Sequence, residues 1–371
     1  MNYKKFLYTI YFCLGTYIFY LTGNTLVPAE DLIIPIAIGH DVIHKDSGDV
    51  EYSIPVSVYN FSEIKPTPIM IKKGIGETIG KTRENRQLSS NLDFILGLEK
   101  TLIFSEEYAS SFEFINSIDI LFNNPTLNDT ALNVVCHGQS IDVLKLNIEG
   151  YTNSSDYIAE LLTHCVEANF FSDNYKLLDI YVRVGAEGRT LVLPYLQIKD
   201  KKPTITGLAI FNKDKMAKVI NINEARILNL LKENKVKGIL SLSKSPKEYI
   251  DFSTTTKREV SCEKVKNKYV FYIDISLEGS IIDNNLYKNI ANDYSITKKF
   301  EEDMNSKVEK MCYRFIDKMQ KEYKIDCLSL GSVAAAKYGR HTGTDWNKAV
   351  SEADIIVNVK TKIDKFGRGD Y

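Results

Sequence analysis

The residues of this chain that could bind a metal are five histidines and six cysteines, and they are scattered along its 371 positions. His40 and His44 are four residues apart, a spacing that suits a metal only when both side chains project from one helix. Residues 40–48 are instead predicted to connect two strands, and no carboxylate occupies an obvious place for a third ligand. No two cysteines have the C-x-x-C spacing of a zinc cage or a thioredoxin-like site. The sequence therefore predicts no metal site and no cofactor site.

Residue pairs that could supply a nucleophile and its base are also poorly arranged. Cys136 and His137 are neighbours on a predicted strand, so their side chains should point to opposite faces. His164 and Cys165 are neighbours on a predicted helix and cannot face each other either. Three serines at the ends of predicted elements lack the G-x-S-x-G setting of a hydrolase nucleophile: Ser105, Ser280 and Ser332. The sequence predicts no catalytic residues and favours a binding or scaffolding role over an enzyme.

A glycine-rich segment, GIGETIG at residues 74–80, could be compared with a phosphate-binding loop. It lacks the Lys-Ser/Thr ending of a P-loop and the strand–turn–helix setting of a dinucleotide fold. We interpret it as a loop that leads into a surface helix within residues 74–92.

The composition is that of a folded protein without a nucleic-acid partner. The formal net charge is −1, from 47 basic and 48 acidic residues, which gives no electrostatic basis for binding nucleic acid. Hydrophobic residues make up 44% of the chain, enough for a packed core, and the length allows two or three domains. Five scattered cysteines outside the N-terminal segment fit no complete disulfide set, so we expect small buried side chains.

The N-terminal segment has the features of an export signal. Residues 6–22 carry no charge and follow two lysines, which predicts a cytoplasmic N-terminus and a body outside the membrane. The tripeptide LTG is of the kind that precedes the modified cysteine of a bacterial lipoprotein, but the next residue is Asn24. An amide cannot replace the thiol in diacylglyceryl transfer, so no lipidation is expected at Asn24. We predict that residues 1–24 form an uncleaved signal anchor.

Residues 25–202 alternate between strand and helix patterns, which is typical of an α/β region. Pro35 and Pro55 lie within the first two strands and favour sheet edges or bulges. Ser105 followed by two glutamates is typical of a helix N-terminus. Strands are predicted at residues 32–39, 51–60, 98–104 and 132–136, and helices within 74–92, from 105 onward, and near 140–146 and 157–170.

The clearest domain boundary is DKKP at residues 200–203, where charged residues precede a proline. Residues 203–371 are therefore predicted to form a second region. It opens with a hairpin and continues with a helix that we expect Asn223 to cap. The predicted strands of this region lie at 207–211, 216–220, 238–243, 252–262, 269–279, 326–330 and 354–363.

The strongest periodic pattern covers residues 299–323, where apolar side chains recur at spacings of three and four on a charged background. This pattern predicts a long amphipathic helix packed across a sheet, with its methionines in the core. The stripe consists of Phe300, Met304, Val308, Met311, Cys312, Phe315, Met319 and Tyr323.

Two polar segments are candidates for contacts with a partner. GRHTGTDW, residues 339–346, ends in the only tryptophan, and an exposed indole at Trp346 would favour a contact site. The other interpretation is an indole packed beneath its own loop. The second candidate is the segment 65–73.

Several segments resemble, in order, the Ger(x)C family, the C subunits of spore germinant receptors. Residues 30–41 resemble the opening strand of that family, and LEKTLIFSEEYA from Leu98 resembles its strand running into a helix. The segment NDTALNVVCHG, which ends at Gly138, is similar to its next strand, and GLAIFNKDKMAKVININEARILNLL from Gly207 is similar to the hairpin and helix that open its C-terminal domain. Residues 323–331, Trp346 and the final strand match its ending.

The resemblance implies a mixed α/β (α+β) fold of three units, with several mixed sheets each flanked by helices and an N-terminal membrane segment. It also implies a non-catalytic receptor subunit in the inner membrane of spores, needed for germination, whose body lies on the outer side. The implied partners are a multipass A subunit and a transporter-like B subunit. Asn24 departs from the family, which usually has a lipid-modified cysteine there. The alternative function is a solute-binding protein that grips the nutrient itself, in a cleft with converging polar groups.

Overall fold

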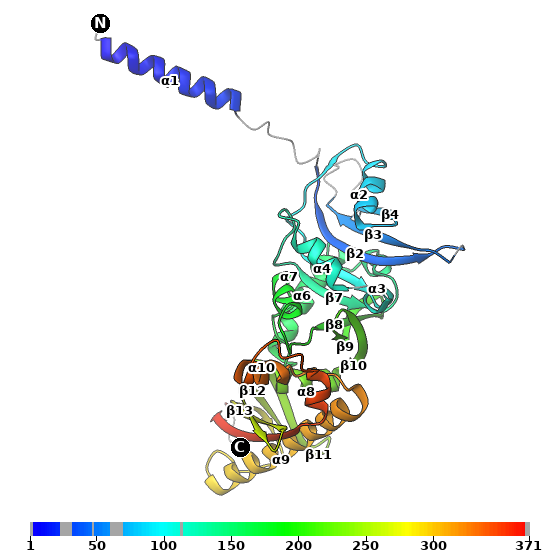
Figure 1. The fold of residues 1–371 in the computed structure, drawn as a ribbon. Coiled ribbons are helices and arrows are strands. Elements are labelled where there is room, and N and C mark those ends of the chain that lie inside the picture. The colour runs from blue at the N-terminus through cyan, green and yellow to red at the C-terminus, as the bar shows by residue number, and fades with distance from the viewer. Residues whose placement is uncertain (1–2, 23–31, 47, 60–69, 112–113, 368–371) are drawn as a thin grey trace.

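The computed structural model describes residues 3–22, 32–46, 48–59, 70–111 and 114–367. Within these residues, strands form an eight-stranded sheet, a four-stranded sheet and a two-stranded sheet. Figure 1 shows an elongated body in which the large sheet lies toward the N-terminal part and the four-stranded sheet toward the C-terminus. Helices accompany both sheets, so the fold is mixed α/β, as the sequence predicts.

The large sheet has a parallel centre and antiparallel flanks. Its order is β10-β9-β8-β7-β6-β2-β3-β4, and β2, β6, β7 and β8 run parallel to their neighbours in that centre. A parallel centre of this kind needs cover on both faces. The strands are β2 (Pro35–His44), β3 (Val50–Val58), β4 (Met70–Gly76), β6 (Thr101–Ser105), β7 (Leu132–Cys136), β8 (Val192–Lys199), β9 (Lys202–Asn212) and β10 (Lys215–Asn221).

Successive residues of the central strands belong to two separate cores, because side chains alternate across a strand. Ala37 and Ile103 pack into one core with α5 and α6, whereas Ile38 and Phe104 pack into the other with α3, α4 and α7. The near-continuous apolar runs of these strands are thereby explained. The helices are α3 (Glu106–Ser111), α4 (Phe114–Phe122), α5 (Ser140–Leu144), α6 (Ser154–His164) and α7 (Leu177–Val184).

The four-stranded sheet is a meander closed by a parallel strand. Its order is β11 (Lys237–Ser245), β12 (Glu248–Val265), β13 (Lys268–Asn284) and β14 (Asp354–Lys365), with β13 and β14 parallel. Buried and exposed residues alternate along β14, so one face of this sheet is exposed to solvent.

The long helix α9 (Tyr294–Lys318) covers the other face of this sheet and continues as a π-helical turn over Met319–Tyr323. The predicted stripe faces the sheet: Phe300, Met304, Val308 and Cys312 are fully buried, and the amphipathic-helix prediction is confirmed. Three shorter helices lie in the same C-terminal half of the chain: α8 (Ile222–Lys232), α10 (Leu330–Tyr338) and α11 (Trp346–Ser351).

Two predicted elements are wrong. Residues 40–44 belong to β2 rather than to a loop, because Asp41 to His44 pair with residues 50–53 of β3. Residues 326–330 form no strand, because Ser329 has a left-handed backbone (φ 58°) and the buried Asp326 instead caps α10. In both segments the local sequence pattern is misleading. Contacts with residues distant in the sequence decide the structure of residues 40–44, and the burial of Asp326 against α10 decides that of residues 326–330.

The predicted cap of α8 is displaced by two residues. Asn221, not Asn223, is the N-cap, and its Oδ1 accepts hydrogen bonds from the backbone N–H groups of Asn223 and Glu224 at 3.0 and 3.1 Å. Asn221 also ends β10, so the helix begins directly at the end of the hairpin.

The boundary predicted between residues 202 and 203 falls at the start of β9, after a turn through Asp200 and Lys201. β8 and β9 pair across this turn in the large sheet, so that sheet contains strands from both sides of the boundary. The division into two regions at this point stays a prediction.

The N-terminal segment forms α1 (Tyr3–Thr22), and its side chains are exposed. Among the described residues, no helix combines the length and the apolar character needed to cross a membrane. Asn24 lies outside the described residues.

Candidate functional site

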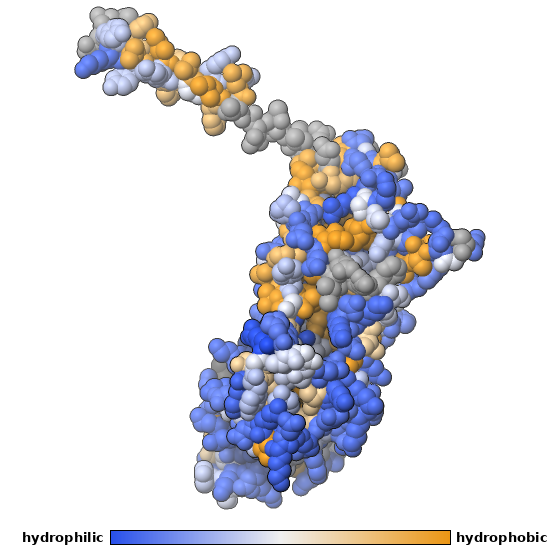
Figure 2. Space-filling view, in the orientation of Figure 1, coloured by the Kyte–Doolittle hydropathy of each residue, from blue (hydrophilic) through white to orange (hydrophobic). Residues whose placement is uncertain are grey.

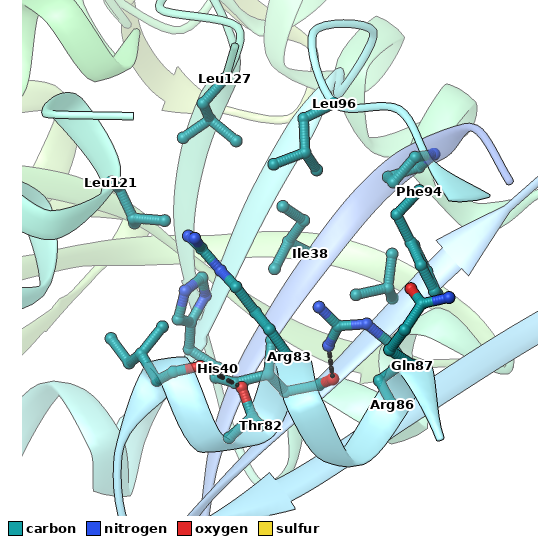
Figure 3. Close-up of a pocket in the computed structure, with 14 residues that line it drawn as sticks. Ile38, His40, Thr82, Arg83, Arg86, Gln87, Phe94, Leu96, Leu121 and Leu127 are labelled. Carbon is teal, nitrogen blue, oxygen red and sulfur yellow. Dashed lines mark hydrogen bonds between the residues drawn. The ribbon is translucent and has the colours of Figure 1, made fainter. Parts of the chain in front are cut away.

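A pocket of about 190 Å³ lies between the short helix α2 (Ile79–Gln87) and strands β2 and β3 of the large sheet. Figure 3 shows its lining: Thr82, Arg83, Arg86 and Gln87 come from α2, and Ile38 and His40 come from β2. The remaining labelled walls are apolar.

Local chemistry fixes the position of α2 over the sheet. Thr78 is its N-cap, and its Oγ1 accepts a hydrogen bond from the backbone N–H of Lys81 at 3.1 Å. The preceding strand approaches the helix at two glycines: a Cβ on Gly74 would lie 2.0 Å from the carbonyl oxygen of Thr82, and one on Gly76 would lie 2.7 Å from Cβ of Lys81. Gly74 and Gly76 therefore permit close packing of helix on strand. The predicted helix within residues 74–92 is confirmed, but the loop predicted before it is wrong: residues 74–76 end β4, so the segment is a strand, a short turn and a helix.

Arg86 is the most unusual side chain of the pocket because its guanidinium is buried, with the residue 8% exposed. One nitrogen, Nη1, donates to the carbonyl oxygen of Ile54 at 3.2 Å, and the guanidinium stacks 5.0 Å from the ring centre of Phe94. Nε has no partner among the described residues. No carboxylate pairs with Arg86 among the described side chains, which do not include that of Asp93.

Burial, and then the neighbouring charge of Arg83, lower the pKa of Arg86 to about 10. Arg86 therefore remains a cation at neutral pH. A buried cation without a counter-charge is costly, since the desolvation penalty is several kcal/mol. Among the described side chains, none that lines the pocket supplies a negative charge for Arg86.

His40 lies at the floor of the pocket and is 1% exposed. Its ring stacks on Phe104 with centroids 4.6 Å apart, and Tyr108 meets it edge-on at 5.5 Å. Burial first, and then the charge of Arg86, lower the pKa of His40 to about 3, so the imidazole is neutral at neutral pH. Its Nδ1 has no hydrogen-bond partner among the described residues.

Besides Arg83, Arg86 and His40, the polar residues of the lining are Gln87 and Thr82, and the hydroxyl of Thr82 donates to the carbonyl oxygen of Ile79 at 2.7 Å. Arg83, on the exposed side of α2, contributes a second guanidinium to the wall. The apolar residues are Pro35, Ile38, Ile54, Val56, Ile79, Phe94, Leu96, Leu121 and Leu127. Cationic donors beside an apolar chamber can hold an anion, but they do not form a nucleophile–base pair.

A second cavity, of about 490 Å³, lies beside Trp346. The indole is buried, with the residue 8% exposed, and its Nε1 donates to Oε1 of Glu187 at 2.9 Å. Oε2 of the same carboxylate accepts the backbone N–H of His341 at 2.7 Å. The indole also lies against Gly331, where a Cβ would be 2.6 Å from Cβ of Trp346. Of the two interpretations of Trp346, the structure has the packed indole, and a partner contact at this loop stays a prediction.

Asp326 forms the wall between this cavity and the core. It is 1% exposed, and its two carboxylate oxygens accept the backbone N–H groups of Leu330 at 3.0 Å and Gly331 at 2.6 Å. Burial raises the pKa of Asp326 to about 7, against the lowering effects of those hydrogen bonds and of Lys232 and Arg258. The arrangement fixes the start of α10 to the body.

The histidines and cysteines considered above are not brought together. Cys136, the last residue of β7, is buried and His137, in the bend that follows, is exposed; Nδ1 of His137 lies 2.9 Å from Oε2 of Glu106. His44 contacts Glu107. Within the described ranges, no group of three or more His, Cys, Asp or Glu residues could hold a metal ion. Residues 65–69 of the candidate docking segment 65–73 lie outside the described residues, and residues 70–73 belong to β4 rather than to a loop.

Sequence reasoning missed Arg86. A signal was present, because Ile79, Thr82 and Arg86 are spaced by three and four and therefore share one helix face, and the structure buries all three. An arginine on the inner face of a short helix is a sign of a buried cation.

Two family models match the chain in succession. Residues 27–198 match the N-terminal domain of spore germination proteins, and residues 206–367 match the C-terminal domain described as spore germination B3/GerAC-like. The crystal structure of the GerBC protein is similar in fold, with a TM-score of 0.59 at 14% sequence identity, over 89% of this chain and 98% of that chain. No curated protein matches the chain.

Proposed function

Because the chain belongs to the Ger(x)C (GerAC-like) family of spore germinant receptor C subunits, we propose that it is a non-catalytic subunit of a nutrient receptor in the spore inner membrane. Its body lies on the outer side of that membrane and contacts a multipass A subunit and a transporter-like B subunit. The observation that carries this proposal is the ordered match of both family domains, which together extend from residue 27 to residue 367.

Two features of the chain support a role in assembly rather than catalysis. The candidate nucleophile and base do not meet, since Cys136, the last residue of β7, is buried and His137, directly after the strand, is exposed. Burial raises the pKa of the Cys165 thiol to about 12, which keeps it protonated and unreactive at neutral pH.

Attachment to the membrane is assigned to α1. Its apolar and tyrosine side chains are exposed, with Phe12 at 72% and Tyr20 at 83%, and the upper end of Figure 2 shows apolar residues along this helix. Moving such side chains from water into a bilayer is favourable, and tyrosine is enriched at the membrane–water interface. Asn24 offers no thiol for a lipid, so α1 provides the attachment itself.

Deleting residues 1–22 should abolish both membrane attachment and germinant response. We expect spores without this protein to lose the response to the nutrients its receptor detects, and the full-length chain to restore it. The truncated chain should appear in the supernatant of lysed spores and should not restore the response. Asn24→Ala is the control and should behave as the unmodified protein, because no lipid is expected there. Retention of the truncated chain in the membrane pellet would contradict the role of α1.

A further inference from the structure

The pocket under α2 contains an imbalance of charge that the receptor-subunit role does not explain. Two guanidinium groups from one helix, those of Arg83 and Arg86, line a chamber whose other walls are apolar except at His40, Thr82 and Gln87. Neither arginine forms an ion pair with a described side chain, the salt bridges of α2 being confined to Lys81 and Glu84. Unpaired buried cations are rare in proteins, because burial of a charge is tolerated when a partner compensates it.

We infer that this pocket binds a small apolar monocarboxylate, whose carboxylate pairs with the guanidinium groups of Arg86 and Arg83 and whose hydrocarbon part packs against the surrounding aliphatic side chains. Arginine is suited to this partner because its planar fork of donors matches the two oxygens of a carboxylate. Nε of Arg86, which has no partner among the described residues, is one donor available for it.

The size and lining of the chamber restrict the hydrocarbon part. A cavity of about 190 Å³ lined by Ile38, Val56, Ile79 and Leu121 suits a short or branched aliphatic chain. The second unsatisfied group, Nδ1 of His40, lies on the neutral ring of the floor. It adds no negative charge that would oppose an anion.

The same charges disfavour an amino acid as the ligand. An α-ammonium group would enter a site with two cations, and the described lining offers it no carboxylate. The proposed ligand is therefore a carboxylate that has no cationic group, and a zwitterionic amino acid is excluded from this class.

Calorimetric titration of the purified full-length chain in detergent tests the assignment. The probes are 3-methylbutanoate, its neutral analogue 3-methylbutanamide, 3-methylbutylamine, leucine and hexadecanoate. We expect saturable heat with 3-methylbutanoate and affinity about tenfold or more weaker for the amide, because a hydrogen bond to a charged group is worth more than one to a neutral group. The amine and leucine should give no heat. Equal affinity for the amide, no heat with the carboxylate at about 10 mM, or tighter binding of hexadecanoate would each overturn the assignment.

Variants separate a binding role of Arg86 from a structural one. Arg86→Met replaces the buried cation with an apolar side chain of similar length, so the free protein should unfold at the same or a higher temperature while carboxylate binding is lost. Arg83→Gln, on the exposed side of α2, should weaken binding without affecting folding. Lys81→Gln, on the same helix and paired with Glu84, is the matched control and should leave binding unchanged. Carboxylate affinity retained in both Arg86→Met and Arg83→Gln would contradict the proposal.

Discussion

Replacing Asp326 by alanine should lower the free energy of unfolding by about 3–5 kcal/mol, one of the largest losses expected for a single substitution in this chain. The carboxylate is buried and accepts the N–H groups of Leu330 and Gly331, so its removal leaves two buried donors unsatisfied at the start of α10. It also removes a negative charge that, together with that of Glu233, interacts with Lys232 and Arg258. Urea unfolding followed by the fluorescence of Trp346, which packs against Gly331, measures this loss directly.

A surface acid provides the control for Asp326. Asp354 pairs with Lys268 at 2.6 Å on an exposed part of the four-stranded sheet, and Asp354→Ala should cost at most about 1 kcal/mol. A loss of similar size for both variants would show that Asp326 does not have the buried capping role assigned to it.

The pH dependence of the same variant has a defined sign. The folded-state pKa of Asp326 is raised to about 7 from a model-peptide value of 3.8, so the folded state binds the proton more tightly than the unfolded state. The contribution of this group to stability is therefore complete below about pH 4 and is lost as the pH rises through about 7. The difference in stability between the unmodified protein and Asp326→Ala should be larger at pH 5 than at pH 8. A difference that grows with pH would contradict the direction of the shift.

Truncating Phe300 should have an effect of similar size, about 3–5 kcal/mol for Phe300→Ala. The side chain is fully buried on the inner face of α9, and its ring centre lies 5.6 Å from that of Phe252 and 5.5 Å from that of Tyr287. The substitution leaves a cavity where α9 meets β12 and also removes two edge-to-face ring contacts. Urea unfolding again gives the measurement.

Tyr294 at the start of α9 is the matched aromatic control, since it is 81% exposed. Tyr294→Ala should change the free energy of unfolding by no more than about 0.5 kcal/mol. If the two aromatic truncations had equal effects, α9 would not be packed on the sheet in the way described.

Elements with a strong local pattern were predictable from the sequence. The apolar spacing in 299–323 identified α9, and the strands predicted at 269–279 and 354–363 lie within β13 and β14. The hairpin of β9 and β10 followed from two apolar segments around a polar turn. In these elements the periodicity of the side chains and the final environment agree.

Elements decided by distant contacts were not predictable in the same way. β2 continues to His44 because it pairs with β6 at His40 and with β3 from Asp41 onward. The buried carboxylate of Asp41 accepts the N–H groups of Ser140 and Ile141 at 2.6 and 3.1 Å. Residues 326–330 resemble a strand, but the capping role of Asp326 depends on the burial of α10. No local pattern encodes these partners.

The pocket was only partly accessible from the sequence. The spacing of Ile79, Thr82 and Arg86 places an arginine on the inner face of α2. How deeply that face is buried depends on the close contact between α2 and β4 at Gly74. The floor at His40 comes from β2, about 40 residues away along the chain, at a residue that the sequence predicts to lie just beyond the strand. That His40 of β2 and Arg86 of α2 line the same pocket can be seen only in the tertiary structure.

Co-purification from spore inner membranes is the most direct test of the proposed function. A full-length chain with a C-terminal affinity tag, solubilised in mild detergent, should be recovered from the membrane fraction together with a multipass A subunit and a transporter-like B subunit. The same protein recovered from growing cells without a membrane fraction, and without either partner from spores, would contradict the assignment as a receptor C subunit.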